Sequence, residues 1–162
     1  MLVINDLAIA RAIHVLAVVV WIGGVAMVTT VILPIVRRAR MPTEGQMLFY
    51  AVERRFIWQA RIATLVVAAS GFYMLDQLRL WDRFRSIEFW WMHAMVLLWL
   101  IFTIVLFIGE PLAGRIRWGH GSQLDSKGRL SLMQWLHWTL LLLSAITVFA
   151  AVAGSHGMSL VP

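Results

Sequence analysis

Residues 7–36, LAIARAIHVLAVVVWIGGVAMVTTVILPIV, decide the fold, because a single charged side chain, Arg11, interrupts this apolar stretch. About 20 apolar residues in helical form cross the hydrocarbon core of a bilayer. The apolar residues are continuous rather than alternating, and an open strand would leave its backbone groups unpaired in lipid. The stretch therefore predicts a membrane-spanning helix. We expect this helix to bend or end at Pro34, since proline breaks the helical hydrogen-bond pattern.

Three later stretches repeat this pattern, and the four predicted spans are residues 7–36, 58–78, 89–108 and 130–153. The composition agrees, because 61% of the residues are hydrophobic and 14% are charged, against about 25% charged in typical soluble domains. Residues 45–56 have a weak amphipathic pattern, and we expect them to extend the second helix; the alternative is a segment that lies along the membrane interface. The predicted fold class is all-α, an integral membrane four-helix bundle in which residues 1–162 form a single transmembrane domain.

The loops that join the first span to the second and the third to the fourth are strongly basic. They hold ten basic residues: Arg37, Arg38, Arg40, Arg54, Arg55, Arg61, Arg115, Arg117, Lys127 and Arg129. The opposite side holds four, and acidic residues dilute them. The positive-inside rule therefore predicts a multi-pass protein of a bacterial inner (cytoplasmic) membrane, with both termini on the outer, periplasmic side. Because topology explains these cations, the net charge of +6 does not indicate nucleic-acid binding.

The absence of cysteine limits the cofactors that the chain can hold. Disulfides, thiolate metal sites, iron–sulfur clusters and covalently attached haem are excluded, so a cofactor must use His, Met or oxygen ligands. Ionisable side chains inside a membrane span are costly and are therefore functional candidates. Three histidines fall within the predicted spans, namely His14, His93 and His137.

His14 and His93 are the predicted axial ligands of one haem b. His14 lies about two turns into the first span and His93 about one turn into the third, both from the outer side. Two imidazoles at matched depth on facing helices suit the iron of a b-type haem. A purely structural alternative is open, since membrane histidines also form hydrogen bonds between helices without any cofactor.

The residues around His14 predict a haem pocket. Trp21 and Gly24 follow His14 at helical spacing, on one stripe that also holds Ala17 and Val28. Gly24 removes side-chain bulk where a flat macrocycle needs room, and Arg11, one turn outward, is a candidate partner for a haem propionate. The alternative for the glycines is close packing between helices.

His137 and His156 are possible further ligands. His137 lies in the inner half of the fourth span, where no second intramembrane histidine matches its depth, and His156 follows the outer end of that span. An alternative copper site would combine His156 with Met95 and Met158, because thioether and imidazole groups suit Cu(I). Ordinary packing also explains methionines in an apolar chain.

Short motifs in three of the spans resemble a known membrane superfamily. The first span has a histidine, a tryptophan seven residues later and then a Gly-Gly pair, followed by Leu33-Pro34; this pattern resembles the first helix of the copper-resistance D (CopD-like) family and of the related HemJ-type protoporphyrinogen oxidases. Further matching segments are Arg54-Arg55-Phe56 with Ser70-Gly71, similar to the CopD-like second helix, and Trp91-Met92-His93-Ala94-Met95, similar to the Trp-Leu-His-Ala-Lys motif of HemJ proteins.

The resemblance implies a four-helix, haem-binding or copper-linked inner-membrane protein in which His14 and His93 match the functional histidines. Met95 departs from the HemJ pattern, because the lysine at this place in the motif is a charged group suited to the substrate's carboxylates.

The expected function is that of a small membrane b-type cytochrome, an oxidoreductase or the membrane subunit of one. It would pass electrons between a quinol-type donor and another redox protein. It would act in the lipid bilayer as a homo-oligomer or as a subunit of a respiratory complex. HemJ-type protoporphyrinogen oxidation and CopD-like copper handling or transport are the alternatives.

Overall fold

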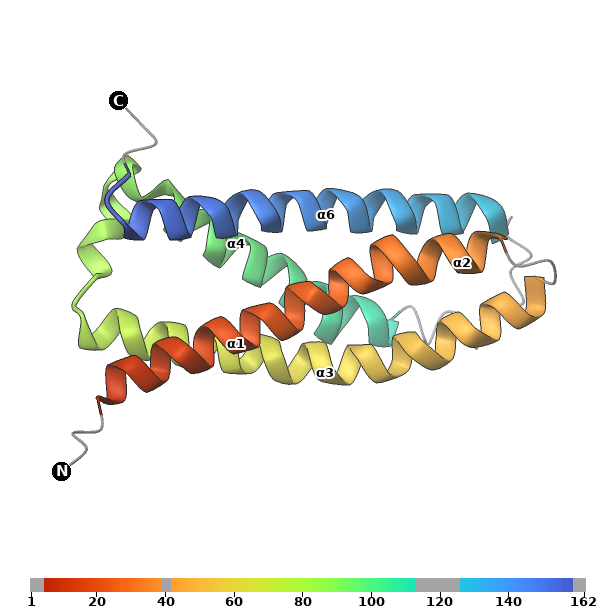
Figure 1. Cartoon of the computed structure of the whole chain (residues 1–162), viewed down its shortest axis with the longest axis horizontal. Helices are drawn as coiled ribbons and strands as arrows, with labels where there is room; N and C mark the ends of the chain where they lie inside the picture. Colours follow the sequence, from red (N-terminus) through yellow and green to blue (C-terminus); the bar gives the residue numbers. More distant parts are fainter. Residues whose placement is uncertain (1–4, 39–41, 113–125, 159–162) are drawn as a thin grey trace.

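The computed structural model describes residues 5–38, 42–112 and 126–158. Throughout these ranges the regular elements are helices (Figure 1). Four helical stretches are long and apolar enough to cross a membrane: Asp6–Arg38, Arg54–Gln77, Ile87–Leu112 and Ser131–Ser155. The predicted all-α class is therefore confirmed for the described residues, and four long apolar helical stretches coincide with the predicted spans.

The first stretch is continuous through its proline. It consists of α1 (Asp6–Met27), the π-helical segment η1 (Val28–Ile32) and α2 (Leu33–Arg38). Of the two outcomes predicted at Pro34, a bend or an end, the end is wrong, because the helix continues to Arg38. In η1 the chain winds more widely, so that the Leu33 N–H reaches back to the Val28 carbonyl, and the helix continues beyond the proline.

Three further helical stretches follow along the chain. α3 (Pro42–Gln77) includes the predicted extension of the second helix, which is confirmed. The 3₁₀ turns η2 (Trp81–Arg85) and η3 (Ile87–Phe89) lead into α4 (Trp90–Ile104), and the π-helical segment η4 (Val105–Gly109) continues it. The last stretch is α6 (Ser126–Ser155).

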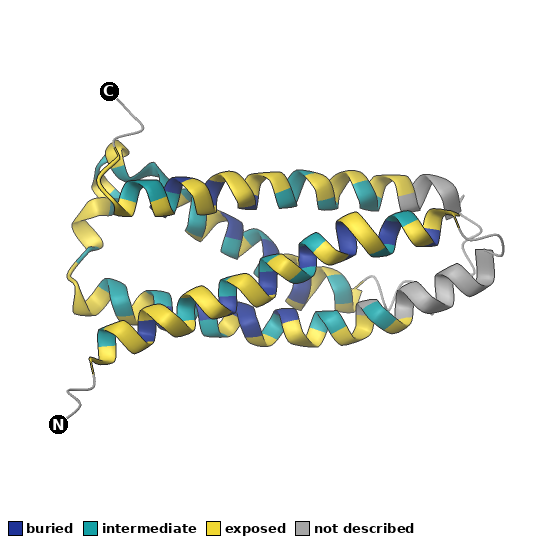
Figure 2. Cartoon of the chain, in the orientation of Figure 1, coloured by how far each residue is buried: buried dark blue, intermediate teal, exposed yellow. Residues whose placement is uncertain are grey.

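The helices form two pairs that meet in a shared core. α1 packs chiefly against α3, and α4 packs against α6. The indole of Trp21 meets the ring of Phe102 edge-on at 4.9 Å between centroids, which joins α1 to α4. Ala17, Trp21 and Val28 are buried, as the predicted stripe requires. Most apolar side chains on the outer surfaces are exposed (Figure 2), as expected of helices that face lipid.

The two ends of the bundle differ in the chain segments they carry. α1 begins and α6 ends at the same end, which we call the terminal end (Figure 1). The opposite end, where α2 finishes with Arg37 and Arg38, we call the basic end. This arrangement agrees with an even number of crossings, and the charge distribution remains the basis for predicting which end faces the cytoplasm.

Candidate functional site

His14 lies half-buried on α1 and turns toward α3. Its Nδ1 is 3.0 Å from the hydroxyl oxygen of Ser70, while that hydroxyl is 2.6 Å from the Val66 carbonyl oxygen. A carbonyl only accepts, so the Ser70 hydrogen is directed to Val66 and the Ser70 oxygen accepts from the His14 N–H. The neutral His14 ring therefore carries its hydrogen on Nδ1, and its Nε2 retains a lone pair for a ligand.

The residue after Ser70 makes room for this ring. A Cβ at Gly71 would lie 3.2 Å from His14 Cε1, which is closer than most real Cβ contacts. Gly71 thus allows α3 to approach the imidazole, and Ser70 fixes its orientation. The sequence analysis named Ser70-Gly71 only as part of a motif that resembles a known family. A small polar pair within an otherwise apolar span was the signal that could have marked these residues as neighbours of His14.

His93 has different neighbours. It is exposed near the beginning of α4, and its Nε2 lies 2.9 Å from the backbone carbonyl of Phe84 in η2. The His93 ring also meets the Phe84 ring edge-on, with centroids 5.2 Å apart. Since a carbonyl accepts, His93 donates from Nε2 in this arrangement. The two histidines predicted as a pair therefore engage separate partners, one on α3 and the other in the turn before α4.

The predicted haem-pocket residues around His14 divide into two groups. Arg11 is exposed at the terminal end, one turn from His14. Trp21 and Gly24 point instead into the middle of the bundle: a Cβ at Gly24 would overlap the Phe56 ring of α3, whereas one at Gly23 would meet nothing within 4 Å. In this structure Gly24 serves the close helix packing that the sequence left open as its alternative role.

Two of the candidate residues, Trp21 and His137, line a pocket in the basic half of the bundle. This pocket of about 90 Å³ is lined from all four membrane helices, and its polar residues are Trp21, Glu110 and His137. Glu110 was not among the residues that the sequence singled out. Its approach to His137 depends on how α4 and α6 are rotated against each other, for which the sequence holds no signal.

The residues of the alternative copper site lie at the terminal end. A Cβ at Gly154 would press on the Trp91 indole, so the end of α6 lies against the beginning of α4. This contact places His156 and Met158 at the same end of the bundle as Met95. The Nδ1 of His156 is 2.8 Å from the Val152 carbonyl, within its own helix. Among the described residues, no group of three or more His, Asp or Glu side chains has the arrangement of a metal site.

Two separate sites therefore contain a histidine. At the first, His14 is hydrogen-bonded to the Ser70 hydroxyl. At the second, His137 lines a pocket together with Glu110 and Trp21. The CopD-like and HemJ-like resemblance of the motifs around His14 and His93 stays a prediction. Comparison of the chain with protein-family models, with curated proteins and with solved structures gave no match.

Proposed function

We propose that the chain is a small b-type haem protein of a bacterial inner membrane, with His14 and His93 as axial ligands. The observation that carries this proposal is the hydrogen bond from His14 Nδ1 to Ser70. Histidines that ligate metals usually donate their second ring N–H to an oxygen, which fixes the tautomer and directs the other nitrogen to the metal. His14 has this arrangement inside a membrane-spanning helix, where an unused polar group would be costly.

The residues present suit a haem on chemical grounds. His14 offers Nε2, the buried Ala17 next to it on α1 adds an apolar side chain, and Arg11 offers a cation to a propionate at the terminal end. His93 can contribute its Nε2 once it exchanges the Phe84 carbonyl for the metal. The haem would supply one-electron redox chemistry, and the protein would supply its ligands, its orientation and a dry setting.

The physiological role that follows is electron transfer in the membrane, from a quinol-type donor to another redox protein. The outward side chains of the four helices are largely apolar, so lipid-soluble donors and neighbouring membrane subunits both have access to the bundle. The protein is then an oxidoreductase or the membrane subunit of one.

The decisive measurement is the dithionite-reduced minus oxidised spectrum of the purified protein, with haem and metal content determined on the same sample. We expect a b-type band, its loss in His14→Ala, and a changed or lost band in His93→Ala. Ser70→Ala should weaken haem retention about 10- to 100-fold, the usual cost of losing a second hydrogen-bond partner of a metal ligand. His120→Ala, at a histidine outside the four predicted spans, is the control. A colourless protein, or unchanged haem content in His14→Ala, would contradict the proposal.

Copper handling is the second candidate, and the contact between Gly154 and Trp91 favours it by bringing the end of α6 beside α4. If the same sample contains copper and no haem, removal of Met95, His156 and Met158 together should abolish the bound copper. Unchanged copper content in that variant would exclude this site.

A further inference from the structure

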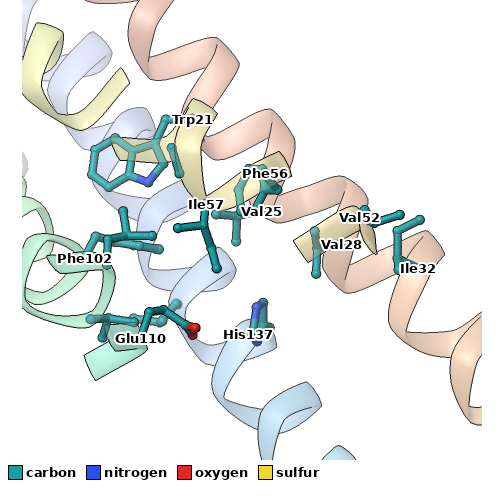
Figure 3. Close-up of a pocket in the computed structure, with 14 residues that line it drawn as sticks. Trp21, Val25, Val28, Ile32, Val52, Phe56, Ile57, Phe102, Glu110 and His137 are labelled. Atoms are coloured by element: carbon teal, nitrogen blue, oxygen red, sulfur yellow. The ribbon is translucent and has the colours of Figure 1, made fainter. Parts of the chain in front are cut away.

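The pocket in the basic half combines apolar walls with three polar groups. Phe56 and Phe102 contribute to its walls, and Trp21, Glu110 and His137 line it from α1, from the end of the third span and from α6. Figure 3 shows the Glu110 carboxylate turned toward the His137 ring, with the Trp21 indole farther along the pocket. Neither His14 nor His93 lines the pocket, so what it binds is independent of haem ligation.

Trp21 brings a buried donor to this pocket. Its side chain is 4% exposed, and within the described ranges its Nε1 has no hydrogen-bond partner. Another membrane tryptophan is satisfied by the protein itself, since Trp99 Nε1 donates to the Thr64 carbonyl at 3.1 Å. A buried indole N–H without an acceptor costs free energy, so a partner inside the pocket is expected at Trp21.

His137 brings an acceptor. Its Nδ1 lies 2.8 Å from the Met133 carbonyl of the same helix, so Nδ1 carries the hydrogen and the Nε2 of the neutral ring is left to accept. The Glu110 carboxylate is a second acceptor, and it is only partly buried close to the end of its span. The pocket thus requires an occupant that both donates to Glu110 and His137 and accepts from Trp21.

The size of the pocket selects among such occupants. An apolar cavity of about 150 Å³ binds benzene, and this pocket, at about 90 Å³, is smaller. Since one water needs about 10–15 Å³ of such space, the pocket has room for a short row of waters. Water also supplies donors and acceptors together, as the three polar groups demand.

We propose that this pocket binds a short chain of water molecules that joins Trp21, His137 and Glu110 and reaches the aqueous phase at the basic end through Glu110. Chains of acidic groups and histidines in membrane proteins commonly mark the routes of protons or ions. The water chain would give the middle of the bundle a hydrogen-bonded connection to one side of the membrane only. The guanidinium of Arg61 is bonded to the carbonyl of Leu106, a residue of the pocket wall.

The test is NMR spectroscopy of ¹⁵N-labelled tryptophan side chains in the full-length protein in micelles. The Trp21 signal is identified by its loss in Trp21→Phe, and Trp99 serves as the matched internal control. We expect a magnetisation-transfer peak between water and the Trp21 indole hydrogen. We also expect exchange about tenfold or more faster than at Trp99, whose bond to the Thr64 carbonyl must open first.

Two variants test the connection through Glu110. Glu110→Leu should slow the exchange at Trp21 to near the rate at Trp99, whereas Glu110→Gln, which keeps a polar group, should retain fast exchange. An unchanged Trp99 signal in both variants reports an intact fold. Exchange at Trp21 as slow as at Trp99 in the unaltered protein would overturn the proposal, and so would fast exchange that persists in Glu110→Leu.

Discussion

Two π-helical segments in this bundle precede prolines, and different side chains form hydrogen bonds to the backbone carbonyls near each of them. η1 ends two residues before Pro34, and η4 ends two residues before Pro111. In both segments the next backbone N–H bonds to a carbonyl five residues earlier. Proline cannot continue this ladder because it has no N–H. In each helix, the missing proline N–H therefore interrupts the π-helical hydrogen bonds two residues after the segment ends.

At η4 the solution comes from a neighbouring helix. Continued by one residue, the pattern would direct the N–H of residue 111 to the Leu106 carbonyl, but Pro111 lacks this group. Arg61 of α3 donates to that carbonyl instead, from Nε at 3.0 Å and from Nη2 at 2.8 Å. Its guanidinium also lies 5.4 Å from the centre of the Trp58 ring and 5.6 Å from that of Phe107.

At η1 the hydroxyls that form hydrogen bonds belong to the same helix. Thr29 donates to the Val25 carbonyl at 2.7 Å, and Thr30 donates to the Ala26 carbonyl at 2.8 Å. The two π-helical segments therefore differ in whether the side chain that bonds to the backbone comes from the same helix or from a neighbouring one. The Arg61 bonds at η4 tie α4 to α3, while the threonine bonds at η1 stay within their own helix.

The largest effect on stability is expected at Gly24, which lies on α1 just before η1 and packs against α3. Gly24→Val should lower the free energy of unfolding by about 3 kcal/mol, because its side chain overlaps the Phe56 ring and forces the two helices apart. Gly23→Ala is the matched control on the open side of the helix and should change stability by at most about 1 kcal/mol, in the stabilising direction. Detergent-induced unfolding followed by circular dichroism measures both. Equal effects at the two glycines would contradict the packing of Gly24 against Phe56.

The next largest effect on stability is expected for the Arg61 hydrogen bonds to the Leu106 carbonyl. Arg61→Met should lower the free energy of unfolding by about 2 kcal/mol, the scale of hydrogen bonds made by a charged group. Arg61→Lys should lose less, since one donor can still reach the Leu106 carbonyl. Arg54→Met, at an exposed arginine of the same helix, controls for the lost charge. The same unfolding titration applies, and an Arg61→Met protein as stable as Arg54→Met would rule out the link.

Pro111→Ala sharpens this prediction because it restores a backbone N–H near Leu106. In that background the cost of Arg61→Met should fall by about 1 kcal/mol, which a double-mutant cycle detects. An unchanged cost would show that Arg61 does not replace the missing donor.

The threonines of η1 give the smallest effect. Thr29→Val keeps the shape of a side chain that is 0% exposed and removes one hydrogen bond within the helix. The expected loss is about 0.6 kcal/mol, the average for such bonds in membrane bundles. Thr30→Val, on the exposed side, should cost less. A loss at Thr29 as large as that of Arg61→Met would remove the distinction between the two segments.

The features that were predictable from the sequence depend on the chain's own composition. Continuous apolar stretches, separated by loops rich in arginine, predicted four helices and a common end for the beginning of α1 and the end of α6. Helical spacing from Ala17 through Trp21 to Val28 predicted the buried face of the first helix. These features follow from the exclusion of polar backbone and charge from lipid, which acts on each segment separately.

The partners of individual side chains were not predictable in the same way. The ring of His14 meets Ser70 and not His93, and Trp21 faces a pocket that it shares with Glu110 and His137. The helix also continues past Pro34, because η1 widens before it. Each outcome depends on the rotation and register of one helix against another, set by many small packing contacts that no single segment encodes.

Four apolar helices, a basic end and three histidines inside the predicted spans were thus readable from the amino-acid sequence, because hydrophobicity and charge are properties of each residue. The folded arrangement was needed to see that Ser70 orients His14, that Arg61 replaces a donor lost to Pro111, and that the Trp21 indole faces a mainly apolar pocket shared with Glu110 and His137. Those relations arise between helices, where the geometry of packing selects which of several possible neighbours each polar group receives.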